Sequence, residues 1–187
     1  MVPKTCLAAV LNKHNRPLSI QKIEIPKLKY GQVLVKIYFT AICGSQLMEI
    51  KGARNTKKFL PHLLGHEASA KVVKTGPGVK KVKINQDVIL SWIKGKGIDA
   101  PLASYKNKKL KINSGRVTTF SQYSVVSENR LYLKPKNISL KNSVLYGCAL
   151  PTGVGMIFNH VKEFKRDIQI IIAGIGGVGL SCYYALK

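Results

Sequence analysis

The sequence is short of acidic residues and of cysteines, and it has no long apolar run near its N-terminus. Its 187 residues include 8 acids against 31 Lys and Arg, which gives a net charge of +23. The four cysteines form no CxxC pair, which argues against a disulfide scaffold and for free or metal-bound thiols. The apolar stretch 6–11 is too short for a secretory signal. These absences predict a protein of the reducing cytoplasm.

The excess positive charge is spread along the whole chain. Lys outnumbers Arg by 26 to 5, whereas nucleic-acid readers favour Arg, whose planar fork pairs with phosphate and guanine. The densest stretch, 94–111, contains one aromatic residue, Tyr105, which is too few for a platform that stacks bases. We expect a solvated basic surface and no nucleic-acid partner. A basic module that binds anions or nucleic acids stays open as an alternative.

The first 140 residues have the pattern of a β protein. Short segments rich in β-branched and aromatic residues alternate with turns that contain Gly or Pro, which is typical of a compact barrel or sandwich. The expected strands are 18–25, 32–40, 71–74, 87–92, 117–126 and 131–134. Beyond them we expect helices over 139–147 and 152–161 and a buried, parallel-type strand over 168–173.

A glycine-rich motif, Gly174-Ile175-Gly176-Gly177-Val178-Gly179, follows that last strand. Such glycines let the backbone approach a pyrophosphate at the N-terminus of the next helix, here expected over 180–186. A turn without a ligand is one alternative. A short membrane span is another, because 170–186 is an uncharged stretch of 17 residues. The acid that holds the ribose, about 20 residues further on, would lie beyond Lys187, so useful dinucleotide affinity is not expected of this chain alone.

Three residues that are distant in sequence carry metal-ligating side chains: Cys43, His66 and Cys148. Catalytic zinc takes three protein ligands, and thiolates and imidazole suit it. The separations of 23 and 82 residues are unlike those of a zinc finger. On spacing alone the signal is weak, because an isolated cysteine is more often an inert core residue. The flanking sequences strengthen it; they read Cys43-Gly44-Ser45, Gly65-His66-Glu67 and Gly147-Cys148-Ala149-Leu150-Pro151-Thr152-Gly153.

These three segments and the glycine motif, in this order, resemble the medium-chain zinc-dependent alcohol dehydrogenases over essentially the whole chain. The resemblance implies a mainly β fold, a GroES-like barrel in residues 1–140, followed by the beginning of an α/β Rossmann fold in residues 141–187. It implies hydride transfer between a small alcohol or polyol and NAD(P), with zinc as the Lewis acid. It also implies no membrane partner and a homo-oligomeric full-length parent.

The resemblance assigns roles to individual residues. Cys43, His66 and Cys148 match the ligands of one catalytic zinc. Ser45 matches the hydroxyl that relays the proton from the alcohol, and Glu67 matches an acid beside the metal. The residues matching the NAD(P) contacts are Thr152, Gly174, Gly176, Gly177, Val178 and Gly179.

Several residues depart from the family pattern. Gln46 replaces an aspartate that orients the zinc-bound histidine; its amide can accept a hydrogen bond from His66 but raises ligand basicity less. Met48 replaces a relay histidine, and Asn85 stands at a turn glycine, where Asn tolerates positive φ. No cysteine lies between residues 92 and 120, so we expect one zinc and no structural zinc.

Two further residues and the activity of this chain carry open alternatives. His62 is expected beside the zinc ligands or at the surface, and Trp92 either lines the substrate cleft or packs in the core. Since most of the cofactor domain would lie beyond Lys187, we expect this chain to be inactive by itself. A non-catalytic remnant that folds and binds zinc is the alternative to an enzyme.

Overall fold

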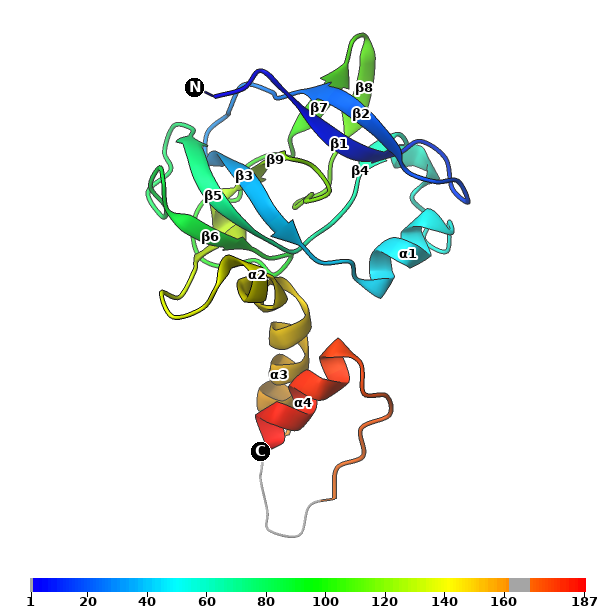
Figure 1. Cartoon of the computed structure of the whole chain (residues 1–187), viewed down its shortest axis with the longest axis vertical. Coiled ribbons are helices and arrows are strands. Elements are labelled where there is room, and N and C mark those ends of the chain that lie inside the picture. Colours follow the sequence, from blue (N-terminus) through cyan, green and yellow to red (C-terminus); the bar gives the residue numbers. More distant parts are fainter. Residues whose placement is uncertain (1, 162–168) are drawn as a thin grey trace.

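Two β-sheets form the larger part of the molecule in the computed structural model, which describes residues 2–161 and 169–187 (Figure 1). The first sheet closes into a barrel in the order β1 (Thr5–Leu11), β2 (Ser19–Glu24), β7 (Ser104–Asn107), β8 (Leu110–Asn113) and β4 (His62–Leu63). The second has the order β10 (Leu131–Leu133), β6 (Asp87–Leu90), β5 (Ala68–Thr75), β3 (Gln32–Thr40) and β9 (Tyr123–Ser127). The mainly β fold expected from the sequence is confirmed.

Strand β3 contributes to both hydrophobic cores. Val33 and Val35 are buried in the cluster between β3, β5 and β6, whereas Leu34 is buried in the cluster inside the barrel. Successive side chains of a strand point to opposite faces, so one strand can supply both clusters. Burying a Val or Leu side chain stabilises a fold by roughly 1.5–3 kcal/mol. This double burial fixes the strand that leads directly to Cys43.

The helices are short and most follow the sheets. They are α1 (Gly44–Ile50), α2 (Leu140–Ser143), α3 (Ala149–His160) and α4 (Gly177–Leu186), with single 3-10 turns η1 (Lys57–Phe59), η2 (Glu128–Arg130) and η3 (Val144–Gly147). Helix α2 and η3 pack against β5. Helices α3 and α4 pack against each other and extend away from the sheets (Figure 1). In the part of the chain that the structure describes, no helix is both long and apolar enough for a membrane span.

Most expected strands form. Strands β2, β3, β5, β6 and β10 lie at the predicted places, although β6 ends at Leu90 rather than at residue 92. The strand predicted over 117–126 is wrong in its first half, because β9 begins only at Tyr123. The backbone N–H groups of Thr119 and Phe120 instead donate to the carbonyl of Leu64. This crossing connects 117–122 to the loop that carries His66.

The C-terminal elements differ more from the prediction. Residue 168 lies outside the described residues, and the described residues 169–173 form no strand; the Ile171 side chain is 93% exposed. A parallel strand needs a neighbouring strand for its hydrogen bonds, and the described residues supply none here. Helix α4 begins at Gly177 instead of 180, and α3 begins at Ala149 instead of 152. The helix predicted over 139–147 is one α-helical turn followed by η3.

Four strands and one α-helix of the structure were not expected from the sequence: β1, β4, β7, β8 and α1. Strands β7 and β8 form a hairpin inside the lysine-rich stretch 94–111. In Figure 1 this hairpin stands at the opposite end of the molecule from α3 and α4. The predicted domain boundary at residue 140 stays a prediction, although the chain does change there from strands to helices.

Candidate metal centre

Cys43, His66 and Cys148 meet at the junction between the sheets and the helices. Cys43 is the N-cap of α1, His66 lies between β4 and β5, and Cys148 is the N-cap of α3. Their candidate ligand atoms all lie within 4.8 Å of one another. The structure thus brings together the three residues that the sequence motifs selected as zinc ligands.

Two glycines make this convergence sterically feasible. Gly65 has a φ of +89°, and a Cβ there would lie 2.2 Å from the Thr119 hydroxyl oxygen. At Gly147 a Cβ would lie 2.4 Å from the Leu90 carbonyl oxygen and 2.6 Å from the Cβ of Glu67. Both approaches are shorter than any side chain tolerates, so the residues before His66 and Cys148 must be glycine.

The surroundings of His66 and Cys148 shift the pKa of each towards its neutral form. Burial, with the nearby positive charge of Arg54, lowers the pKa of His66 despite the opposing effect of Glu49. Burial, together with the neighbouring Glu67 and Cys43, raises the pKa of Cys148 to about 11. A neutral imidazole is the form that binds metal, and a bound cation would favour the thiolate of Cys148.

Glu67 is a buried acid behind the ligands. Burial raises its pKa, although the backbone N–H groups of Ala149 and Cys148 donate hydrogen bonds to it and partly oppose the shift. The same two N–H groups open α3, so Glu67 connects the start of β5 to the start of α3. The hydroxyl of Thr40 donates to the Glu67 carbonyl at 2.9 Å and fixes this position from β3.

Several buried polar atoms at and around the three ligands lack hydrogen-bond partners among the described residues. Within the described part of the chain, four buried side-chain atoms have no hydrogen-bond partner here: Ser45 Oγ, His66 Nε2, Glu67 Oε2 and Thr152 Oγ1. Buried polar atoms without partners are costly and rare. A cation with its ligand set would use His66 Nε2, so these residues fit a zinc ion.

A cavity of about 400 Å³ opens over the ligands. Its lining consists of Cys43, Ser45, Arg54, His66, Trp92, Cys148, Thr152 and Val178. Trp92, for which the sequence left core or cleft open, therefore lies in the cleft, and 49% of it is exposed. Val178 comes from the glycine motif at the start of α4, so the motif borders the metal cavity. Ser45, Arg54 and His66 also line an adjoining cavity of about 390 Å³.

The glycine motif has only part of the expected context. Gly176 is the N-cap of α4, and Gly177, Val178 and Gly179 form its first turn, as a pyrophosphate site requires. Gly174 lies in the preceding loop and has a positive φ of 100°. The strand that should precede this loop is absent from the described residues, so the dinucleotide contacts stay a prediction.

The side-chain amide of Gln46 contacts two of the three ligands, Cys43 and His66. Its Oε1 accepts a hydrogen bond from the backbone N–H of Cys43 at 3.0 Å, which caps the start of α1. Its Nε2 lies 2.5 Å from Nδ1 of His66. The expectation was that Gln46 accepts a hydrogen bond from His66; in the structure the NH₂ group, a donor, faces Nδ1 of His66, and the oxygen faces Cys43.

An ion pair between His62 and Glu49 and an arginine, Arg54, lie beside the site and were not expected from the sequence. His62 is buried; its Nε2 lies 3.1 Å from a carboxylate oxygen of Glu49, and its Nδ1 donates to the carbonyl of Leu63 at 2.9 Å. The pair connects α1 to β4. Arg54 borders both cavities, but an isolated arginine in a polar loop has no pattern that marks it. The spacing of Glu49 and His62 likewise gives no signal without the fold.

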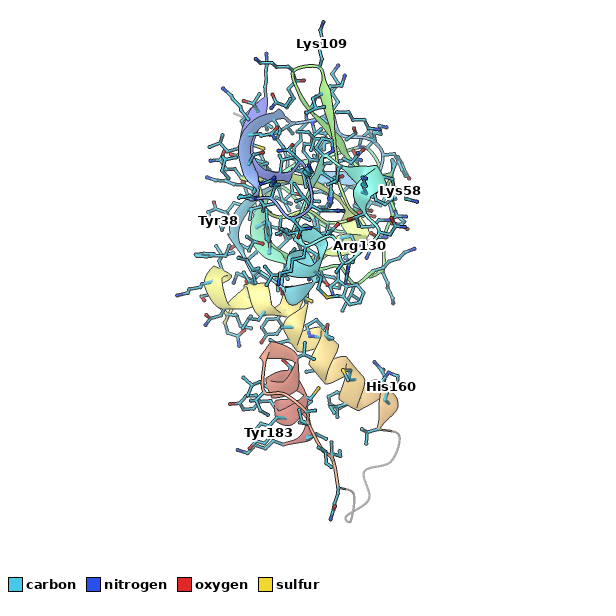
Figure 2. The ribbon with its side chains drawn as sticks, turned by 90° about the vertical axis from the view of Figure 1, so that its right-hand side faces the viewer. Tyr38, Lys58, Lys109, Arg130, His160 and Tyr183 are labelled. Atoms are coloured by element: carbon cyan, nitrogen blue, oxygen red, sulfur yellow. The ribbon has the colours of Figure 1, made fainter. Side chains whose placement is uncertain are left out.

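The basic stretch 94–111 offers no base-stacking surface. Tyr105, its one aromatic residue, is 1% exposed and points into the barrel core. Lys109 lies at the tip of the β7–β8 hairpin, far from His160 and Tyr183 at the other end of the molecule (Figure 2). The expected solvated surface is consistent with this arrangement.

Comparisons with known proteins place these features in a family. The family model of the alcohol dehydrogenase GroES-like domain matches residues 29–136. A class-3 alcohol dehydrogenase of Pisum sativum is 31% identical, and the match covers 95% of this chain and 53% of that protein. The chain spans about half the length of the curated relatives it matches.

Solved structures share the fold. An alcohol dehydrogenase zinc-binding domain protein from Burkholderia ambifaria has a TM-score of 0.81 at 22% identity, over 97% of this chain and 55% of that one. Acetophenone reductase from Geotrichum candidum, solved with NAD, has a TM-score of 0.78 at 20% identity, over 97% of this chain and 54% of that one. The family match over more than half of its length shows that the chain belongs to the zinc-dependent medium-chain alcohol dehydrogenase family.

Proposed function

We propose that this chain forms the zinc-binding part of an NAD(P)-dependent alcohol dehydrogenase, which transfers hydride between a small alcohol or polyol and the nicotinamide. The observation that carries the proposal is the convergence of Cys43, His66 and Cys148 within 4.8 Å. Membership of the family supports the reaction type. The chain spans about half of its relatives, so turnover is proposed for the whole protein.

Cys43, His66 and Cys148 hold one zinc ion in this proposal. When bound, zinc supplies the Lewis acid that favours negative charge on the substrate oxygen. The cavity over the ligands, with Trp92 on its wall, receives the alcohol. Thr152 and Val178 border the same cavity, which is where a nicotinamide must lie to accept hydride from the substrate carbon.

Ser45 takes the proton from the substrate hydroxyl. Its Oγ is buried, has no partner among the described residues, and borders both cavities. A hydroxyl can accept one proton while donating its own, so Ser45 transfers a proton from the inner cavity to the adjoining one. Glu67 supplies negative charge behind the ligands and favours a cation there.

The cofactor and cellular setting are further parts of the proposal. The contacts with NAD(P) are assigned to Thr152 and to the glycine motif, Gly174, Gly176, Gly177, Val178 and Gly179. All four cysteines are free thiols, which fits the reducing cytoplasm. The homo-oligomeric state of the whole protein and the absence of a structural zinc stay predictions.

Zinc content of the purified chain tests the proposal directly. Elemental analysis should find about one zinc per chain, in line with a single catalytic set of three ligands. Cys43→Ser should remove it, because a neutral hydroxyl replaces a thiolate ligand. The matched control is Cys6→Ser, which changes a buried thiol outside the site and should retain the metal.

Zinc-free but folded wild-type protein would contradict the proposal. Circular dichroism of the same samples establishes that each variant is folded. A folded chain without zinc would point to a zinc-free relative or to a non-catalytic remnant. Equal zinc in the wild type and in Cys43→Ser would place the metal elsewhere.

A further inference from the structure

The Gln46 side chain hydrogen-bonds to one proposed zinc ligand, Cys43, and contacts a second one, His66. It lies in the first turn of α1 and is 5% exposed. Its amide bridges the backbone N–H of Cys43, 3.0 Å from Oε1, and Nδ1 of His66, 2.5 Å from Nε2. The amide of Gln46 is therefore largely shielded from water, whereas Cys43 and His66 are half-buried.

The amide of Gln46 has one acceptor oxygen, but two neighbouring groups can each need an acceptor for a hydrogen bond. A primary amide offers one oxygen as acceptor and an NH₂ as donor. The N–H of Cys43 is always a donor. A neutral imidazole that binds a metal through Nε2 carries its proton on Nδ1 and must donate it. Nε2 is the ring nitrogen of His66 that Gln46 leaves free.

Without a metal, the oxygen and the NH₂ group of the Gln46 amide both have partners, whereas Nε2 of His66 has none among the described residues. Oε1 accepts from Cys43, and Nε2 of the amide donates to Nδ1 of His66, whose own proton then lies on Nε2. When a metal binds to Nε2 of His66, the ring proton moves to Nδ1. The N–H at Nδ1 and the NH₂ group of Gln46 then face each other, and both are hydrogen-bond donors. Rotating the amide by half a turn only moves the conflict to Cys43. One donor therefore faces another in either orientation of the amide when a metal is bound.

We propose that Gln46 is a positioning residue that lowers the zinc affinity of this centre by stabilising the metal-free tautomer of His66. The inference rests on the proposed function, since it assumes that zinc binds at His66. A carboxylate at position 46 has two acceptor oxygens, so it can serve Cys43 and His66 together. Partners of this kind alter metal affinity by about 10–100-fold.

The test compares the zinc affinity of the full chain with that of Gln46→Glu. Zinc dissociation constants are measured by competition with a chromophoric chelator. We expect Gln46→Glu to bind zinc about 10–100-fold more tightly than the wild type. Met48→Glu is the matched control, because it adds the same charge on the same helix from an exposed position; it should change the affinity by less than about 3-fold.

A spectroscopic measurement separates this role from a purely structural one. Long-range ¹H–¹⁵N NMR of the ring of His66 should show the proton on Nε2 without zinc and on Nδ1 with zinc in the wild type. In Gln46→Glu the proton should lie on Nδ1 in both states, because the carboxylate accepts it. A role limited to capping α1 would leave the tautomer unchanged by the substitution.

The outcomes distinguish this inference from the proposed function. Zinc that depends on Cys43 but binds Gln46→Glu and wild type equally would overturn the inference alone. Equal tightening in Met48→Glu would also overturn it, since charge would then explain the gain. Zinc binding that ignores Cys43 in both proteins would overturn the proposed function and this inference together.

Discussion

Glu128, outside the metal centre, accepts hydrogen bonds from three backbone N–H groups. It is 3% exposed, and its Oε2 accepts from the backbone N–H groups of Lys80 at 3.0 Å and Lys81 at 3.1 Å. Its Oε1 accepts from the N–H of Ile98 at 2.8 Å. Burial raises its pKa, but these three N–H groups and the charge of Lys81 outweigh burial and lower it overall.

Replacing this carboxylate should therefore destabilise the fold. In Glu128→Gln an NH₂ faces at least one buried backbone N–H, which should lower the free energy of unfolding by about 1–3 kcal/mol. Urea unfolding at neutral pH measures the loss. Glu24→Gln, at an exposed position of β2, is the control and should change stability by less than about 0.5 kcal/mol.

The same residue predicts the direction of the pH dependence. Because the pKa of Glu128 in the folded state lies below its ordinary value of 4.5, its contribution is complete above that value. It disappears as the pH falls through the folded-state pKa. The difference between wild type and Glu128→Gln should therefore shrink in acid; a difference that grows in acid would contradict this account.

At the residue scale, motifs predicted the ligands but not their partners. Cys43, His66 and Cys148 were identified by their flanking glycines, and Gly65 and Gly147 prove to be sterically required. Asn85 adopts the expected positive φ of 71°. The partners of Gln46 lie 3 and 20 residues away, and those of Glu128 lie 30 to 48 residues away. Apart from the local contact between Gln46 and Cys43 at the start of α1, these contacts form only when distant segments pack together, so no local pattern predicts them.

At the scale of elements, the β7–β8 hairpin shows why composition misled the prediction. Lysine disfavours strands, so a stretch with six lysines between residues 94 and 111 gave no strand signal. The exposed lysines lie on the outer face, whereas Tyr105 and Ile112 face the core of the barrel. Conversely, the apolar run 168–173 predicted a strand, but the described residues provide no neighbour for its backbone.

The turn of this hairpin contains a non-glycine residue with a strained, left-handed backbone. Its two loop residues are Lys108 and Lys109, and Lys108 has a φ of +54°. A left-handed backbone costs an L-residue about 1–2 kcal/mol, and glycine removes this cost. The greater flexibility of glycine in the unfolded chain offsets about 0.5–1 kcal/mol of the stabilisation. Lys108→Gly should therefore raise the free energy of unfolding by up to about 1 kcal/mol.

Urea midpoints of two glycine variants check this prediction. Lys109→Gly removes the same charge from the same loop without relieving a positive φ, so it should be neutral or destabilising. A destabilised Lys108→Gly, or equal effects of both substitutions, would show that the turn carries no such strain.

At the scale of the whole molecule, the net charge of +23 dominates. With 8 acids for 31 Lys and Arg, most positive charges have no opposite charge to pair with. Charges of one sign repel one another in the compact state, and salt screens this repulsion. The sequence predicted this surface correctly, since charge is a property of composition and needs no fold.

Added salt should therefore stabilise the protein. Raising NaCl from about 20 mM to about 300 mM shortens the screening length from roughly 20 Å to roughly 6 Å. The thermal midpoint, followed by circular dichroism, should rise by a few degrees. Sucrose at equal osmolality controls for solvent effects that do not involve charge. A midpoint that falls with NaCl would mean that favourable ion pairs outweigh the repulsion.

The convergence of ligands from distant segments has a consequence for the chain as a whole. Cys43 and Cys148 are 105 residues apart, and they are the N-caps of two different helices, α1 and α3. A metal held between them acts as a reversible cross-link that fastens the α3–α4 arm to the barrel. Its free energy of binding adds to that of folding as the free metal concentration rises. The stability of this protein is then set jointly by its sequence and by the supply of zinc around it.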